Sequence, residues 1–218
     1  KELIDKVDAV SIAVPTKFHF EVTKLAIERG VNALVEKPLC SSPELSRKIY
    51  NLSKSNNVTV SVGHIERFNP VITKFRQLLA ESSEKVLSIS ASRFSARPTR
   101  INDVGVIYDL SIHDIDLICF IFGLFPVNIS CSAFSASGNE EHVKLLMEFD
   151  GEQVGSCETS WLSNENLRRL EILTDKNFWV LDLLDLKIIK SNNLEGKSIL
   201  EVEKVNALEA EITNFLTS

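Results

Sequence analysis

The fold of this chain is decided by residues 7–38, "VDAVSIAVPTKFHFEVTKLAIERGVNALVEKP". The runs at 7–15 and 31–38 are short and apolar, as expected of strands buried on both faces. Between them, residues 19–30 have the spacing of an amphipathic helix and end at Gly30, a residue that often terminates helices. Strand, helix and strand in this order predict a right-handed parallel β–α–β unit.

The same alternation continues downstream. Residues 42–57 predict a second helix, with Ser42 as its N-cap and Pro43 at its first position, and residues 58–63 predict a third strand. This order is typical of a doubly wound α/β domain, but none of the eight glycines has the G-x-G-x-x-G spacing of a dinucleotide-binding turn. We therefore expect residues 1–66 to be the C-terminal half of a truncated Rossmann-type domain, with its N-terminal half absent.

The pattern changes after residue 66. Asn69 and Pro70 can start a helix that runs to about residue 80. Long runs of alternating β-rich sequence follow at 86–96, 127–137, 142–162 and 167–191, with Asp150-Gly151 as a hairpin turn within the third. Residues 67–218 thus predict an α+β domain, an open and mostly antiparallel sheet packed by helices on one face. The other sheet face needs a cover, and we expect a homodimer or homotetramer to provide it.

Composition excludes several classes of protein. The 218 residues are 44% hydrophobic and 25% charged, with a net charge of −6 and scattered lysines and arginines, which argues against nucleic acid as a partner. No apolar run approaches the roughly 18 residues of a membrane span, and the first residues lack the apolar core of a signal peptide. We expect a cytoplasmic protein without a membrane partner. Its four cysteines lack a C-x-x-C pair, so neither disulfide nor zinc is expected.

A polar stripe interrupts an otherwise apolar helix predicted at 107–123, "IYDLSIHDIDLICFIFG". At about 100° per residue, Asp109, His113 and Asp116 share a stripe about 60° wide, whereas Asp114 lies apart. A carboxylate four residues before an imidazole can fix its tautomer, which suits a general base. Two alternatives stay open: a core histidine satisfied by a neighbouring acid, and a metal site made of Asp109, His113 and Asp116.

Charged residues also mark the end of the second strand. Glu36, Lys37 and Pro38 lie at the carboxyl edge of the predicted parallel sheet, where ligands bind in open α/β folds. Pro38 keeps Lys37 out of helical geometry, and an ammonium group there could polarise a substrate hydroxyl or carbonyl. A surface lysine before a turn would have the same sequence.

The other strand ends carry polar residues as well. After the first strand come Pro15, Thr16 and His19, at the same ligand edge, although Thr16 could simply cap the next helix. Past the third strand, the residues that predict either a pocket wall or a salt-bridged hinge are His64, Glu66, Arg67 and Asn69.

Three segments taken in order closely resemble the Gfo/Idh/MocA family, the glucose–fructose oxidoreductase and inositol dehydrogenase superfamily. They are "AVPTKFHFEVTKLAIERGVNALVEKPLC" (13–40), "VGHIERFNP" (62–70) and "DVGVIYDLSIHDIDL" (103–117). The resemblance implies a Rossmann domain followed by an α/β domain with an open sheet. It also implies hydride transfer between a sugar or cyclitol carbon and the nicotinamide of NAD or NADP.

The resemblance further implies roles for individual residues. Lys37 matches the lysine of the E-K-P motif, and Asp109 and His113 match the D-x-x-x-H motif, with His113 as the base and Lys37 orienting the hydroxyl. The residues implied to bind the cofactor are Pro15, Thr16, His19, Glu36 and Lys37. The residues expected to bind substrate are Lys37, Arg67, Asn69, Asp109 and His113.

Within the family, "GHIERFNP" and "RPTRINDVGVIYDLSIHDID" are most similar to members that act on UDP-N-acetylglucosamine at C3, so a nucleotide sugar is the expected substrate. Relatives continue past "LEAEITNFLTS" (208–218) into a last helix, which we expect to be absent here. Two rival hypotheses remain: a non-catalytic ligand-binding or regulatory member of the fold, and a metal-dependent hydrolase that uses the stripe of Asp109, His113 and Asp116.

Overall fold

The structure is a computed structural model that describes residues 4–99, 104–136, 138–194 and 196–218. Its contacts divide the chain into two compact units. Unit 1 consists of Lys1–Ile65 together with Asn206–Ser218, and unit 2 consists of Glu66–Val205. Part of the segment "RPTRIND", residues 100–103, lies outside the described residues.

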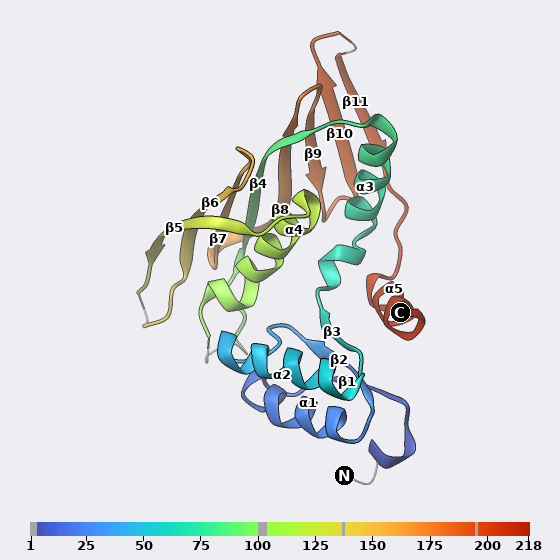
Figure 1. Cartoon of the computed structure of the whole chain (residues 1–218). Helices are drawn as coiled ribbons and strands as arrows, with labels where there is room; N and C mark the ends of the chain where they lie inside the picture. Colours follow the sequence, from blue (N-terminus) through green and yellow to red (C-terminus); the bar gives the residue numbers. More distant parts are fainter. Residues whose placement is uncertain (1–3, 100–103, 137, 195) are drawn as a thin grey trace. The chain divides into compact units, whose positions relative to one another are not determined.

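Unit 1 contains a three-stranded parallel sheet in the order β1-β2-β3, flanked by two helices (Figure 1). Its elements are β1 (Ala9–Ile12), α1 (His19–Glu28), β2 (Asn32–Glu36), α2 (Pro43–Asn56) and β3 (Val60–Gly63). Gly30 has φ +70°, a left-handed conformation that follows the end of α1. The Ser42 hydroxyl accepts a hydrogen bond from the Leu45 N–H at 3.3 Å, as its predicted role of N-cap requires. The predicted β–α–β–α–β order is confirmed.

The last helix, α5 (Ala207–Thr217), corrects the expected domain division. The sequence analysis placed this segment in the second domain, but its contacts group it with unit 1. A physical reason is Glu211, which is buried in unit 1 and close enough to Glu36 at the end of β2 to feel its charge. The first boundary falls after Ile65, one residue before the expected position.

Unit 2 is built on an eight-stranded sheet in the order β11-β10-β9-β8-β4-β7-β6-β5 (Figure 1). β4 and β7 run parallel, and the other neighbouring strands run antiparallel. The strands are β4 (Val86–Ala96), β5 (Pro126–Phe134), β6 (His142–Phe149), β7 (Val154–Ser160), β8 (Leu162–Thr174), β9 (Phe178–Asp182), β10 (Lys187–Asn192) and β11 (Gly196–Glu201). The predicted open, mostly antiparallel sheet is confirmed.

One strand boundary shows why the β-rich run at 167–191 forms more than one strand. The Asp182 carboxylate accepts hydrogen bonds from the N–H groups of Leu184 and Asp185, at 3.0 and 2.8 Å. Leu186 then adopts a left-handed φ of 55°. Because an aspartate side chain can stabilise a turn in this way, the chain reverses between β9 and β10 without a glycine or proline.

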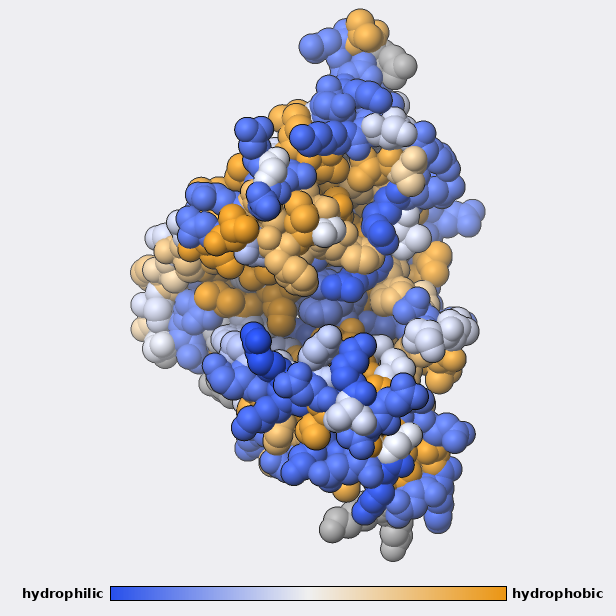
Figure 2. Space-filling view, viewed as in Figure 1, coloured by the Kyte–Doolittle hydropathy of each residue, from blue (hydrophilic) through white to orange (hydrophobic). Residues whose placement is uncertain are grey.

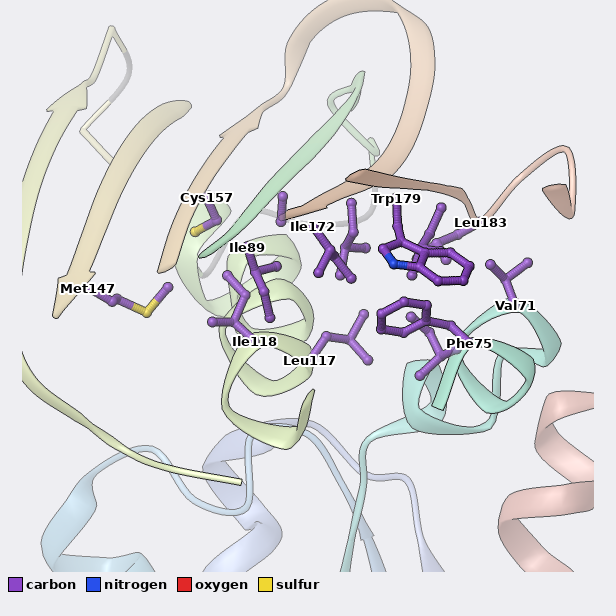
Figure 3. Close-up of a cluster of buried hydrophobic side chains, with 14 of the residues drawn as sticks. Val71, Phe75, Ile89, Leu117, Ile118, Met147, Cys157, Ile172, Trp179 and Leu183 are labelled. Atoms are coloured by element: carbon purple, nitrogen blue, oxygen red, sulfur yellow. The ribbon is translucent and has the colours of Figure 1, made fainter. Parts of the chain in front are cut away.

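Helices cover one face of this sheet. α3 (Pro70–Ser82) and α4 (Ile112–Phe122) lie over its centre (Figure 1), and their apolar side chains meet those of the strands (Figure 3). Phe75 of α3 packs edge-on against Trp179 of β9, with ring centroids 5.5 Å apart. Gly155 permits the close approach of α4, because a Cβ there would lie 2.7 Å from Ile118 Cγ2.

The surfaces of the two units differ. Figure 2 shows hydrophobic side chains gathered over the region of α4 and β5, whereas α1 and α2 present a mostly hydrophilic surface. None of the helices in the described ranges has the length and apolar composition needed to cross a membrane.

Candidate functional site

The end of β2 presents the E-K-P motif. Glu36 is the last residue of β2, is exposed, and accepts a hydrogen bond from the Lys37 N–H at 3.2 Å. Its neighbour on β3 is Gly63, where a Cβ would lie 3.5 Å from Glu36 Cδ. The side chain of Glu36 therefore lies beside Gly63, and both charged groups of the motif are at the carboxyl edge of the sheet, as predicted.

His19 joins the two loops at this edge. It is 1% exposed, with Nδ1 2.8 Å from the Pro38 carbonyl oxygen and Nε2 2.8 Å from the Val14 carbonyl oxygen. Carbonyl oxygens only accept, so both hydrogen bonds form together only when both ring nitrogens carry protons. His19 thus connects the loop after β1 to the loop after β2, and its predicted contact with the cofactor stays a prediction.

Pro15 and Thr16 lie in the loop after β1. Pro15 is exposed, its carbonyl accepts the Phe18 N–H at 2.8 Å, and Thr16 begins a short 3₁₀ turn that ends at Phe18. In this part of the described chain no side chain caps α1, so Thr16 does not act as its cap. The capping alternative is therefore wrong, and the Thr16 hydroxyl is available at the ligand edge.

Glu211 is a buried carboxyl group in unit 1 that the sequence analysis missed. It is 3% exposed, and its Oε1 has no hydrogen-bond partner among the described residues. Burial, with a smaller contribution from the nearby Glu36 carboxylate, raises the pKa of Glu211 to about 7. Glu211 follows Glu36 by more than 170 residues, so no sequence pattern predicted that the two carboxyl groups lie close together.

The donor set of unit 1 fits the nicotinamide half of a dinucleotide. A nicotinamide riboside presents hydroxyl and carboxamide donors, and the exposed Glu36 carboxylate can accept from them. The Lys37 ammonium and the Thr16 hydroxyl add donors at the same edge of the sheet. Glu36, Lys37 and Thr16 thus stay the residues predicted to hold this group.

In unit 2, Gly105 and Glu140 fix the start of the segment that carries Asp109. The Val106 N–H donates to the Glu140 carbonyl oxygen at 2.9 Å, and the Ile107 N–H donates to Glu140 Oε1 at 3.2 Å. A Cβ at position 105 would overlap the Glu140 carboxyl group. The glycine in "DVGVIYD" therefore lets the Glu140 carboxyl group lie against the backbone in this conformation, and Glu140 is a partner that the sequence analysis missed.

The helix that was predicted as continuous at 107–123 has two parts. Residues Ile107–Ser111 form a π-helical turn, η4, and the α-helix α4 begins at Ile112. π-helical turns occur frequently at functional sites. Asp109 is half-buried in this turn, and His113 is half-buried in the first turn of α4. Their predicted contact with each other stays a prediction.

Asp114 has a structural role that the sequence analysis did not predict. The helical projection set Asp114 apart from the polar stripe, but Asp114 is 2% exposed and is bound by Arg93 of β4. Arg93 Nε lies 3.0 Å from both carboxylate oxygens of Asp114, and Nη2 lies 2.9 Å from Oδ1. The projection of a single helix could not show this, because the partner comes from a strand about twenty residues earlier.

Glu66 completes a buried charge network around Arg93. Glu66 Oε1 accepts from Arg93 Nη1 at 2.9 Å and from Arg168 Nη1 at 3.3 Å, and Oε2 accepts from Asn69 Nδ2 at 3.3 Å. Burial acts to lower the pKa of Arg93, but the carboxylates of Asp114 and Glu66 outweigh it and raise that pKa above its ordinary value. Arg93 is therefore held in its charged form.

Asn69 and Arg67, both predicted to bind substrate, have structural partners. Asn69 Oδ1 accepts from the Val71 N–H at 3.0 Å and caps α3. Arg67 Nε and Nη2 donate to the two oxygens of Asp116 at 2.8 and 2.6 Å, and its guanidinium lies 4.7 Å from the centre of the Phe120 ring. Hydrogen bonding to Asp116 raises the pKa of Arg67. Substrate binding by either residue stays a prediction.

The alternative of a metal site finds little support in this geometry. Both carboxylate oxygens of Asp116 accept from Arg67. Within the described ranges, no group of three or more His, Cys, Asp or Glu side chains is arranged to hold a metal ion.

Comparisons with known proteins identify the family. A family model described as an oxidoreductase family with an NAD-binding Rossmann fold matches residues 1–64, and the model of the GFO/IDH/MocA C-terminal domain matches residues 74–179. The chain belongs to the Gfo/Idh/MocA family of oxidoreductases. Membership confirms the expected class, a nicotinamide-dependent dehydrogenase with a Rossmann domain and an open-sheet domain.

Among the relatives, the UDP-N-acetylglucosamine 3-dehydrogenase of Acidithiobacillus ferrooxidans is 28% identical over 99% of this chain and 71% of its own length. A solved structure of that enzyme superimposes with a TM-score of 0.92, covering 99% of this chain and 70% of the other. An inositol 2-dehydrogenase of Corynebacterium glutamicum is 31% identical over 67% of this chain, which spans 46% of that relative.

Proposed function

We propose that this protein oxidises a secondary hydroxyl of a nucleotide sugar, UDP-N-acetylglucosamine at C3, with NAD or NADP as the hydride acceptor. The observation that carries the proposal is that this chain has two motifs and also aligns over nearly its full length with one relative. Lys37 of E-K-P follows β2, Asp109 and His113 of D-x-x-x-H lie on η4 and α4, and 99% of the chain aligns with a UDP-N-acetylglucosamine 3-dehydrogenase.

In this proposal each charged group has one task. The nicotinamide supplies the hydride acceptor when it is bound. His113 takes the proton of the substrate hydroxyl, and Asp109 orients the imidazole and stabilises its charged form. The Lys37 ammonium orients the same hydroxyl and stabilises the negative charge that develops on its oxygen.

The remaining predicted residues serve binding. Pro15, Thr16, His19 and Glu36 line the nicotinamide half of the cofactor, with Lys37 beside them. His19 contributes through the loops that it connects, since both ring nitrogens are 2.8 Å from backbone carbonyl oxygens. Asn69 belongs to the substrate side, whereas the guanidinium of Arg67, also predicted to bind substrate, pairs with Asp116.

Substitution of the two motif residues tests the catalytic assignment. In the intact protein, Lys37→Ala and His113→Ala should each lower turnover by about 10² to 10⁴-fold, the range of general acid–base contributions. Nicotinamide absorbance reports turnover, and calorimetry checks that cofactor still binds. Matched controls are Lys24→Ala on α1 and His142→Ala on β6, neither of which has a role in this proposal. Unchanged rates in both motif variants would refute it.

The product tests the substrate and the position of oxidation. Incubation with UDP-N-acetylglucosamine and NAD or NADP, followed by reduction with borodeuteride, should place deuterium at C3. Deuterium at another carbon would correct the position, and turnover with inositol alone would correct the substrate class. Cofactor absorbance that stays constant with every sugar tested would favour a non-catalytic, ligand-binding member of the family.

The open face of the unit 2 sheet supports the proposal of a homodimer or homotetramer. By their register, charged residues of alternating sign lie along one row of this face, with Ser92 of β4 between Glu158 and Arg169. They are Lys144, Glu158, Arg169, Asp182, Lys187 and Glu201. Such a row can pair with its own copy about a twofold axis. A monomeric mass in analytical ultracentrifugation at micromolar concentration would refute assembly.

A further inference from the structure

Around the axis of α4, His113 lies between the carboxylates of Asp114 and Asp116. An arginine from outside the helix binds each of these carboxylates. Arg93 of β4 binds Asp114, and Arg67 of the preceding segment binds Asp116. At about 100° per residue, Asp114 lies about 100° from His113 around the helix axis and Asp116 about 60° away on the other side. The two ion pairs therefore lie on opposite sides of His113 around the helix axis.

Each arginine binds its carboxylate through Nε and Nη2, the two nitrogens on one edge of the guanidinium. Arg93 uses Nε and Nη2 at 2.9 to 3.0 Å from Asp114, and Arg67 uses Nε and Nη2 at 2.8 and 2.6 Å from Asp116. A planar guanidinium that meets both oxygens of a carboxylate fixes its orientation, which a single ammonium group does not. Two such contacts at different angles oppose rotation of α4 about its own axis.

One short turn anchors both pairs. Glu66 and Arg67 are neighbours in η3 (Ile65–Phe68). Glu66 accepts from Arg93 at 2.9 Å, while Arg67 donates to Asp116 directly. The start of α3, β4 and α4 are thus connected through two adjacent residues, and a shift of this turn would reach both sides of His113.

We propose that Arg67 and Arg93 are positioning residues that fix the direction of the His113 imidazole. This rests on the proposed function, in which His113 takes the hydroxyl proton. The arginines act through Asp116 and Asp114 and take no part in the proton transfer itself. Because a misplacement of about 1 Å can cost on the order of 10²-fold in rate, loss of either pair should affect the chemical step more than binding.

The half-buried pair of Arg67 and Asp116 gives the first test, because it is less buried than the pair of Arg93 and Asp114 and therefore more tolerant of change. In the intact protein, Arg67→Lys and Asp116→Asn should lower kcat by about 10- to 100-fold, shift its pH profile, and change KM by less than about threefold. The matched control is Arg76→Ala, since Arg76 also stacks on Phe120, at 4.1 Å from the ring centre. A raised KM with unchanged kcat would place Arg67 on the substrate instead and overturn the proposal.

A spectroscopic readout separates this proposal from the proposed function. The ¹H–¹⁵N imidazole signals of His113 in the full chain, assigned with His113→Gln, should change in tautomer and titration midpoint in Arg67→Lys but not in Arg76→Ala. Unaltered His113 signals in Arg67→Lys and Asp116→Asn would refute positioning, whatever the turnover. A wild-type protein without turnover would refute the proposed function alone.

The buried pair needs a variant that folds. Arg93→Met combined with Asp114→Leu replaces the pair by apolar groups, a change that proteins often tolerate in stability, while Arg168 and Asn69 still donate to the Glu66 carboxylate. With folding verified by circular dichroism, this double variant should also lose kcat and alter the His113 signals. A folded double variant with wild-type kcat and wild-type His113 signals would overturn the role of Arg93.

Discussion

The two units hold their candidate site residues by different means. In unit 1, the groups at the sheet edge are held by the backbone: Glu36 accepts from the next N–H, and His19 spans two carbonyl oxygens. In unit 2, the helix that carries His113 is held by buried ion pairs, with Arg93 between Asp114 and Glu66. The contact of His19 with Pro38 spans 19 residues and that of Arg93 with Asp114 spans 21, so the two units differ in the charge of these contacts rather than in their separation along the chain.

This difference has energetic consequences. A buried charge that loses its partner costs far more than a lost cap or a lost hydrogen bond, because the remaining charge stays desolvated. Variants in unit 2 should therefore have large, cooperative effects on stability, and variants at the edge of unit 1 should have smaller and more local ones.

The largest effect should come from Arg93→Ala, which leaves Asp114 and Glu66 buried without their shared partner. We expect a loss of about 3 to 5 kcal/mol in the free energy of unfolding. Both tryptophans, Trp161 and Trp179, lie in unit 2, so urea unfolding followed by tryptophan fluorescence reports on the correct unit.

The matched control for that variant is Arg169→Ala on β8. Arg169 pairs with Glu171 at 2.7 Å, but both side chains are more than 40% exposed, so the loss should stay below about 1 kcal/mol. Equal losses for the two arginines would mean that burial does not govern the network.

The second largest loss of stability should come from His19→Ala in unit 1. Removal of the buried ring takes away its contacts with the carbonyl oxygens of Val14 and Pro38, at a cost of about 2 to 3 kcal/mol. Hydrogen exchange of the amides in β1 and β2, measured by mass spectrometry, should rise locally. His142→Ala on β6 is the control, and protection that is unchanged in His19→Ala would contradict the bridging role.

A smaller, pH-dependent effect is expected at Glu211. Its pKa is raised to about 7 from an ordinary 4.5, so the folded state holds the proton more tightly than the unfolded state does. This contribution to stability is fully present below about pH 4.5, is lost as pH rises toward 7, and stays absent above it. Its size is at most about 3 kcal/mol, at about 1.4 kcal/mol per pKa unit.

Glu211→Gln should remove this dependence. As pH rises from 4.5 to 7, the wild-type α5 should open more often, so its amide exchange rate, corrected for intrinsic rates, should increase. In the variant, the corrected exchange rate should not change with pH. Glu209→Gln on the same helix, which is exposed, should behave as wild type. An identical pH profile in Glu211→Gln and wild type would show that Glu211 does not titrate as a buried group.

The smallest effect should come from the local cap of α2. Ser42→Ala removes the hydroxyl that accepts the Leu45 N–H, at a cost of about 1 kcal/mol. Ser41→Ala, at the exposed neighbouring position, should change stability very little. Thermal unfolding by circular dichroism measures both, and a loss in Ser41→Ala as large as that in Ser42→Ala would argue against a specific cap.

The sequence predicted most of the fold because the signals are short-range. The cap at Ser42, the helix start at Asn69 and the positive φ after α1 at Gly30 each depend on a few neighbouring residues. Strand periodicity likewise identified β4 over its full length, Val86–Ala96. The turn between β9 and β10 was missed because an aspartate side chain, rather than a glycine or proline, stabilises it.

For the candidate site, the sequence by itself determined which residues carry the motifs: Lys37 at a strand end, and Asp109 and His113 four residues apart. Only the tertiary structure decided that Asp114 is the buried carboxylate of α4 and that Arg93 binds it. A motif is read along one segment, whereas the partner of a buried charge is chosen by which segments pack together. That choice depends on the whole fold, so no local pattern could have revealed it.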